Sequence, residues 1–415
     1  MKKTYQYFLS FFCLGIVITV GMTAVPCYAD FQSDLDSLEQ LVQAKQWGAA
    51  EPIATKLFEQ YPNELVAKYY YGMVCNNVGR YTEAVAVLQE IVHDNTSFAD
   101  AYHQLAYGLR HIGKVPEAFE MLKIANEIDP SNYTVVFHLG VVYLLLNKPD
   151  DAIAQFNEFL GKFPDHPEGL FFVGHAYTYK KDPVQSKEYW HKVLRIDPYH
   201  EQTLAELAKL YFYEGALLNA ERLFTQLVQA HPHHLNGYLF LGEIYFIQQQ
   251  FQKARNAYFE IIQIDPNNAE AYEQLSVLYL TTGNWAGAIK AADKVLAINS
   301  DSPEAFLNKG FALMELGHTD KAIEMYTAVL RINPNLPTAY FNLGLIYHSQ
   351  GEWDKALHHF GNVLKLLPDH AQALYNMGDV YIMRHESEKA GQIYTKLKDI
   401  DTVLAEKLHS RLSTQ

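Results

Sequence analysis

Cysteine is scarce in this sequence, with only Cys13, Cys27 and Cys75 among 415 residues. The first two lie in an N-terminal apolar segment, so the rest of the chain holds one cysteine, which cannot form an internal disulfide. The fold must therefore be stable without cross-links. Cys75 is predicted to be a buried small apolar side chain rather than a reactive thiol.

Signatures of catalysis are also missing. The sequence has no Gly-rich phosphate loop, no G-x-S-x-G, no H-E-x-x-H and no paired C-x-x-C. It also lacks Gly/Ser linkers, charge runs and low-complexity tracts that would separate a second domain. We therefore expect a protein that is not an enzyme, with no cofactor, no metal centre and no evident small-molecule substrate.

Positive charge is in deficit. The chain has 33 Lys+Arg against 47 Asp+Glu, which gives a formal net charge of −14. A negatively charged protein repels phosphate backbones and anionic lipid headgroups. Nucleic acid is therefore not expected as a partner, and contact with a membrane is expected only through an envelope complex or an uncleaved N-terminal anchor.

Proline, in contrast, recurs at intervals of 34 residues. Eight prolines belong to this series: Pro62, Pro130, Pro164, Pro198, Pro232, Pro266, Pro334 and Pro368. Such internal periodicity indicates stacked structural repeats. With the proline at position 32, eleven repeats follow without an insertion: 31–64, 65–98, 99–132, 133–166, 167–200, 201–234, 235–268, 269–302, 303–336, 337–370 and 371–404.

The other columns of this frame predict two helices in each repeat. Position 20 is alanine in every repeat except the fifth, which has Ser186, and position 8 is glycine, alanine or serine in ten repeats. Glycine within a helix costs about 1 kcal/mol relative to alanine, so its recurrence implies close helix packing. Positions 4, 7, 8 and 11 share one helical face, as do 20, 24, 27 and 28. Because Pro52 falls outside these rules, the second helix of the first repeat is expected to start late.

One repeat shows a known pattern in full. The motif Y-x2-L-G-x2-Y…A-x3-F…P is formed here by Tyr340, Leu343, Gly344, Tyr347, Ala356, Phe360 and Pro368. It resembles the tetratricopeptide repeat. The resemblance implies an all-α fold, a right-handed α-solenoid superhelix of about eleven helix-turn-helix repeats over 31–404. Residues 405–415 are expected to form a capping helix over the last repeat.

The N-terminal residues have the layout of a secretory signal. Lys2 and Lys3 precede an apolar run from Phe8 to Met22, and Cys27-Tyr28-Ala29 offers a small-x-small cleavage site. We predict a signal peptide over 1–29, cleaved after Ala29, and a periplasmic or secreted protein. The alternative is an uncleaved inner-membrane anchor formed by residues 5–26.

The resemblance also implies a concave groove lined by the first helices, at positions 2, 5, 6, 9, 12 and 13. Candidate partner-binding residues that packing does not explain are Tyr107, His138, Phe172, His175, Tyr179, Lys209 and Tyr213. A groove rich in Tyr, Phe and His suits an extended peptide or an amphipathic helix. The alternative is a solvated inner surface with incidental aromatic side chains.

Two groove types known in the family can be tested against the residues. The carboxylate clamp uses Lys at position 5 and Asn at position 9, and no repeat here has Lys at position 5. Asn308, Asn342 and Asn376 at position 6 resemble the asparagine ladder of O-linked N-acetylglucosamine transferase, whose amides bind a peptide backbone. Asparagine is also common there in the family, so a structural role stays open.

Histidines allow a rival interpretation. His103, His138 and His175 come from the first helices of consecutive repeats and would form a metal- or pH-responsive site if they converged. His231, His233 and His234 fall in a turn between repeats and are expected to be solvated. The favoured function is an exported scaffold for envelope assembly, secretion or polysaccharide export; a third possibility is an accessory subunit of an envelope enzyme.

Overall fold

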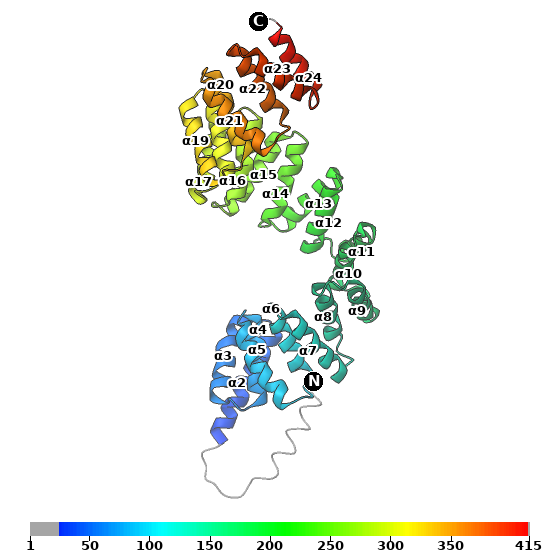
Figure 1. Ribbon diagram of the computed structural model, residues 1–415. Coiled ribbons are helices and arrows are strands. Elements are labelled where there is room, and N and C mark those ends of the chain that lie inside the picture. Colours follow the sequence, from blue (N-terminus) through cyan, green and yellow to red (C-terminus); the bar gives the residue numbers. More distant parts are fainter. Residues whose placement is uncertain (1–24, 414–415) are drawn as a thin grey trace. The chain divides into compact units, whose positions relative to one another are not determined.

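The computed structural model describes residues 25–413, and over this range the chain contains 23 α-helices and no strand (Figure 1). The helices stack as successive helix-turn-helix pairs, so the predicted all-α fold class is confirmed. Most of the predicted signal peptide lies outside the described residues. The first described helix, α2, begins at Val25, so the predicted cleavage position falls within that helix.

The first helices of the pairs begin every 34 residues from α4 onward. Their bounds are α2 Val25–Gln43, α4 Leu65–Asn77, α6 Ala99–His111, α8 Tyr133–Leu145, α10 Pro167–Tyr179, α12 Glu201–Tyr213, α14 Leu235–Ile247, α16 Ala269–Thr281, α18 Pro303–Glu315, α20 Pro337–Ser349 and α22 Ala371–Met383. From α4 onward these starts coincide with position 1 of the repeats read from the sequence.

In the eight repeats that have proline at position 32, the second helix ends two residues before that proline, which cannot continue a helix. The second helices are α3 Trp47–Gln60, α5 Tyr81–Asp94, α7 Val115–Ile128, α9 Pro149–Lys162, α11 Pro183–Ile196, α13 Leu217–Ala230, α15 Phe251–Ile264, α17 Trp285–Ile298, α19 Thr319–Ile332, α21 Trp353–Leu366 and α23 Ser387–Lys398. A final helix, α24 Thr402–Leu412, follows the last pair.

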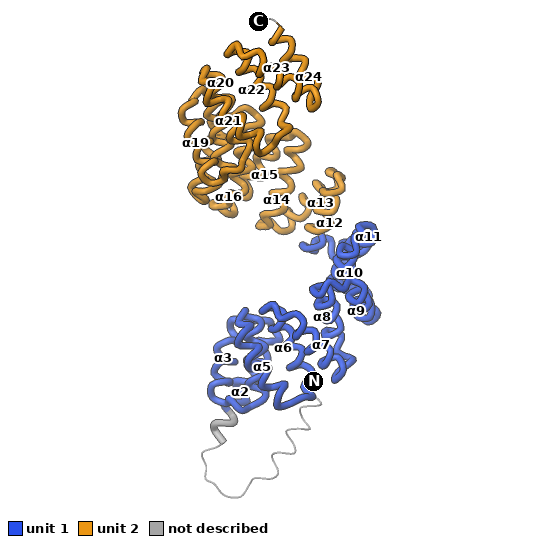
Figure 2. Tube along the Cα trace, in the orientation of Figure 1, with its two compact units in different colours: residues 1–203 blue, residues 204–415 orange. Residues whose placement is uncertain are grey.

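The chain divides into two compact units, with the border between Thr203 and Leu204 in the first turn of α12 (Figure 2). Within each unit a helix packs against its neighbours in sequence, and first helices of successive pairs also touch, as α4 does α6 and α16 does α18. The cores are correspondingly a series of small clusters between adjacent helices. Cys75 is buried in one of them, as predicted.

The small residues of the frame are explained by close helix contact. The alanines at position 20 are all fully buried, and Ser186 in the same place donates its hydroxyl hydrogen to the Asp182 carbonyl, 3.0 Å away. A Cβ added at Gly242 would lie 2.2 Å from Cε1 of Tyr258, the buried position 24 ring of the same repeat. Position 8 must therefore be small wherever a large ring occupies position 24.

The turn inside each repeat needs a left-handed residue at position 15. Six repeats supply glycine there with φ between 72° and 87°. The other five have Lys45, Asn147, Lys181, Gln249 and His385 in the left-handed region, with φ between 55° and 60°. Side chains other than glycine are disfavoured in this conformation, so the turn geometry is imposed by the packing of the two helices it joins.

The expectation about Pro52 is wrong. Helix α3 begins at Trp47, in register with the other second helices, and contains Pro52 in its interior. The proline has no N–H to donate to the Gly48 carbonyl four residues earlier, so one helical hydrogen bond is missing. Burial of Ala50, Ala54 and Leu57 on the packed side of α3 stabilises the helix in spite of that loss.

Helix α24 covers the end of the last repeat. It packs on both α22 and α23, and Asp401 caps its N-terminus by accepting a hydrogen bond from the Leu404 N–H at 2.9 Å. Leu408 is fully buried over Gly378, where an added Cβ would lie 2.6 Å from Cδ2 of that leucine. The apolar side of the last helix pair is therefore covered by α24 and is not exposed to solvent.

Candidate functional site

The first helices of each compact unit form a surface that we call the inner face. In the N-terminal unit this face includes α4, α6, α8 and α10, which carry Tyr107, His138, Phe172, His175 and Tyr179. In the C-terminal unit it includes the first helices α12, α14, α16, α18, α20 and α22. These helices carry Lys209, Tyr213, Asn308, Asn342 and Asn376. The ten predicted residues thus lie on first helices, five in each compact unit.

Two histidines of the N-terminal unit are in direct contact. Nε2 of His103 lies 2.6 Å from Nδ1 of His138, so one ring donates a hydrogen bond to the other. Burial, together with the nearby Arg110 charge, lowers the pKa of His103 to about 4. Burial, His103 and Arg110 together lower the pKa of His138 to about 3. The pair is therefore neutral at physiological pH and acts there as a hydrogen-bonded bridge between α6 and α8.

The side chains around this pair are aromatic or cationic. The Tyr107 ring centroid lies 6.4 Å from that of His138, and Cζ of Arg110 lies 5.2 Å from the Tyr107 centroid. His111 stacks on Tyr81 at 4.3 Å. Arg110, His111 and Tyr81 were not singled out in the sequence. The signal that could have found Arg110 is its place at position 12, which faces the groove in this family.

Three predicted residues of α10 differ in how much they are available for binding. Phe172 is packed between the rings of Phe137, 5.4 Å away, and Phe156, 5.6 Å away. His175 stacks on Phe171 at 5.9 Å and meets Tyr179 edge-on at 5.4 Å. Tyr179 is 44% exposed. Phe172 therefore supports the core, while Tyr179 presents its ring to solvent.

The three histidines of the rival interpretation, His103, His138 and His175, converge only in part. His103 and His138 touch, but His175 contacts the α10 aromatic rings instead. Within residues 25–413 no group of three or more His, Cys, Asp and Glu side chains is arranged to hold a metal ion. The histidine pair alone supplies too few ligands for a zinc site of the usual kind.

In the C-terminal unit the aromatic side chain of Tyr213 is strongly exposed. Its ring is 76% exposed and rests edge-on against Phe212, 5.5 Å away, and Phe240, 6.5 Å away. Lys209, one turn earlier on α12, pairs with Glu206 at 2.8 Å. An aromatic ring held by other rings at its base and open on its far side is suited to contact a partner.

Carboxylates dominate the next part of this inner face. Burial raises the pKa of Glu243, and Glu270 raises it further. The pKa of Glu273 is raised by burial, by Glu304 and by Glu270. The sequence analysis did not identify these glutamates, because their clustering depends on which positions of adjacent repeats face one another.

The three asparagines of the predicted ladder are half-buried on α18, α20 and α22. Asn376 donates its amide to the carbonyl of Gln372 in its own helix, at 2.8 Å. A local hydrogen bond of this kind must be given up before the side chain can bind a peptide backbone. The backbone-binding role of Asn308, Asn342 and Asn376 stays a prediction.

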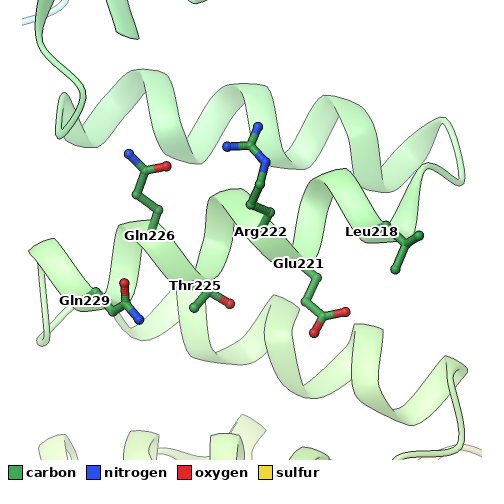
Figure 3. Close-up of a pocket in the computed structure, with 6 residues that line it drawn as sticks. All are labelled: Leu218, Glu221, Arg222, Thr225, Gln226 and Gln229. Atoms are coloured by element: carbon green, nitrogen blue, oxygen red, sulfur yellow. The ribbon is translucent and has the colours of Figure 1, made fainter.

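A depression of about 550 Å³ lies over the outer face of α13 (Figure 3). All its lining residues come from that helix: Leu218, Glu221, Arg222, Thr225, Gln226 and Gln229. Glu221 also accepts a hydrogen bond from Gln248 at 3.1 Å. None of these residues belongs to the inner face, and the depression does not enclose a paired nucleophile and base.

Comparison with known proteins agrees with the helix geometry. Models described as "Tetratricopeptide repeat" match residues 134–166, 212–278, 245–309 and 337–370, and one described as "TPR repeat" matches 310–351. The chain is a tetratricopeptide repeat protein. Such proteins are typically non-catalytic scaffolds, and their partners are generally proteins or peptides.

Several solved structures are similar to parts of the chain. MamA is 26% identical over 41% of this chain and 94% of its own, with a TM-score of 0.38. YrrB, described as "a TPR protein with an unusual peptide-binding site", is 25% identical over 45% of this chain and 97% of its own, with a TM-score of 0.38. Yeast Tom70 is 14% identical over 92% of this chain and 94% of its own, at 0.40. No curated protein matches the sequence.

Proposed function

We propose that this protein is a non-catalytic scaffold that binds a peptide or protein partner on its inner faces. The observation that carries the proposal is the exposure of Tyr213. Packing between helices covers most of the large rings in the described chain wholly or in part, yet Tyr213 is 76% exposed on a first helix. Tyrosine offers a large contact area at a low cost in side-chain entropy, and for that reason it is frequent at binding hot spots.

The test is a photo-crosslinking amino acid placed at Tyr213 in the living cell, followed by mass spectrometry of the captured protein. Arg222 provides the matched control, because it is exposed on α13, the second helix of the same repeat. We expect a discrete partner from position 213 and none from position 222. Capture from position 222 alone would assign binding to the outer face and overturn the proposal.

We further propose that the protein is exported and acts in envelope assembly, secretion or polysaccharide export. The support is the signal-like layout of Lys2, Lys3 and the apolar run that follows them. No helix of the described chain is both long enough and apolar enough to span a bilayer. N-terminal sequencing of the protein from cell fractions tests this: Asp30 at the N-terminus in the periplasm supports cleavage, whereas an intact N-terminus in inner membranes supports the anchor formed by residues 5–26.

A second candidate function is a pH response, which the contact between His103 and His138 favours. Protonation of either ring would place a positive charge beside Arg110 in a site from which water is largely excluded. Partner binding to the N-terminal unit would then weaken in acid. Because the pKa of His103 is about 4 and that of His138 about 3, affinity that stays constant between pH 7 and about pH 3.5 would exclude this function.

A further inference from the structure

Arg110 is a charged side chain of the N-terminal inner face without a carboxylate partner. It is only partly exposed, and within the described chain it forms no ion pair: its Nη2 lies 3.1 Å from Nε2 of His111, and its Cζ lies over the Tyr107 ring. Arg80, which lies between α4 and α5 of the same unit, forms ion pairs with Glu51 and Glu83 instead. The charge of Arg80 is therefore balanced by two carboxylates, whereas that of Arg110 is not balanced by any carboxylate of the described chain.

The surroundings of Arg110 supply no negative charge. Burial lowers the pKa of its guanidinium, and the nearby groups that oppose this effect are the hydroxyls of Tyr107 and Tyr81. The Arg110 charge in turn lowers the pKa of His103, His138 and His111. In a chain with a net charge of −14, this patch therefore has the opposite character to the surface as a whole.

A partly desolvated guanidinium without a counter-ion carries an electrostatic cost that a ligand can relieve. Its five N–H donors form a planar fork that matches a carboxylate in bidentate geometry. Ring faces flank it on one side, from Tyr107 and from the stacked pair Tyr81 and His111. These features together define an acceptor for a planar anion next to an aromatic surface.

We propose that Arg110 is a subsite for a carboxylate of the peptide ligand, with Tyr107, Tyr81 and His111 contacting the adjoining residue of that peptide. The inference rests on the proposed peptide-binding function and specifies it for the N-terminal unit. Arg110 stands at position 12 of its repeat, not at the positions 5 and 9 used by the carboxylate clamp. The carboxylate comes from an Asp or Glu side chain or from the C-terminus of the partner.

The experiment uses the full-length protein, immobilised, and two libraries of short random peptides, one with free C-terminal carboxylates and one amidated. Peptides retained by the wild type are sequenced by mass spectrometry. A preference for Asp or Glu at one register in both libraries identifies a side chain as the source. Retention confined to the free-acid library identifies the C-terminus. The selected peptide is then compared with a counterpart in which the acid is replaced by its amide.

We expect the wild type to prefer the acidic peptide over its amide counterpart by about tenfold or more, because a charge-assisted bidentate pair is lost. Arg110→Gln should abolish this preference, and Arg110→Lys should retain only part of it. Arg222→Gln, which removes an exposed outer arginine, should leave it unchanged.

The possible failures can be told apart. If the wild type retains peptides without preferring acidic ones, or if Arg110→Gln keeps the preference, the subsite is overturned while peptide binding stands. If the wild type retains no peptide, the proposed function fails and the subsite fails with it. If Arg110→Gln does not fold, Arg110→Lys still tests the assignment: it keeps the charge but loses the planar fork, so an undiminished acid preference in Arg110→Lys would overturn the subsite.

Discussion

Nη2 of Arg411 lies 2.8 Å from Oδ1 of Asp379, whose side chain is only 5% exposed. The other carboxylate oxygen, Oδ2, accepts a hydrogen bond from Nε2 of His348 at 2.9 Å. The ion pair therefore joins the final helix α24 to α22, the first helix of the last repeat. The hydrogen bond from His348 joins α20, in the preceding repeat, to the same carboxylate. Helices α20, α22 and α24 are therefore linked through the buried Asp379 carboxylate.

Arg411→Leu should loosen the C-terminal end of the protein. The substitution leaves the buried Asp379 carboxylate without its arginine partner and with a hydrogen bond from His348, at a cost of about 1–3 kcal/mol. We expect faster amide hydrogen exchange in α22 to α24 and little change in α14 to α18. Lys389→Gln is the control, since it breaks a solvent-screened pair with Glu386 that is expected to contribute little to stability. Equal effects of the two variants would show that the buried pair contributes nothing.

Two glycine-to-alanine substitutions should act in opposite directions. At Gly242 the new Cβ meets the buried Tyr258 ring at 2.2 Å, so overpacking should destabilise the C-terminal unit by about 1–3 kcal/mol. At Gly361, within α21, nothing lies within 4 Å, so the gain in helix propensity should stabilise it by about 0.5–1 kcal/mol. Urea unfolding followed by circular dichroism measures both. Destabilisation at Gly361 would contradict the interpretation.

Acid should weaken the contact between α6 and α8. The pKa values of His103 and His138 are about 4 and about 3 in the folded protein, below the ordinary value near 6.5. The unfolded chain therefore takes up protons first as the pH falls. The stability that this pair contributes is fully present above about pH 6.5 and is lost as the pH falls toward about 4.

The loss amounts to at most about 1.4 kcal/mol per pH unit for each histidine. Hydrogen exchange of α6 and α8, corrected for the intrinsic pH dependence of exchange, measures it. In a His103→Gln, His138→Gln variant the dependence between pH 6.5 and pH 4.5 should become shallower. A slope identical to that of the wild type would mean that the pair does not titrate as stated.

The two aromatic side chains of α10 should respond differently to truncation. Phe172→Ala removes a ring packed between Phe137 and Phe156 and should cost about 2–3 kcal/mol. Tyr179→Ala removes a ring that is 44% exposed and should change stability by about 0.5 kcal/mol or less. Thermal unfolding compares them. If partner capture by the N-terminal unit is lost in Tyr179→Ala with stability intact, the ring has a binding role.

The repeat frame could be predicted from the sequence because each of its columns has a separate physical cause. Proline at position 32 ends a helix, alanine at position 20 allows close approach, and glycine at position 8 makes room for a ring such as Tyr258. These requirements recur in most repeats, so they reinforce one another. Pro52 misled the prediction because one missing hydrogen bond is a smaller loss than the burial that holds α3 in register.

The inner faces were harder to predict, since their side chains are not constrained by the repeat. The contact between His103 and His138 joins positions 5 and 6 of adjacent repeats, and a single repeat does not reveal that these positions meet. Phe172 was expected in the groove, yet its position 6 ring turns toward the core. The missing counter-ion of Arg110 is visible only when all its neighbours are known.

The left-handed residue at position 15 has a consequence for how such a gene can change. Every repeat closes its own turn within its own sequence, and its helices pack only on neighbouring elements. Duplication or deletion of one whole repeat within a compact unit would therefore preserve both the turn and the packing register. Evolution can adjust the number of inner-face positions in single steps, without redesign of the core.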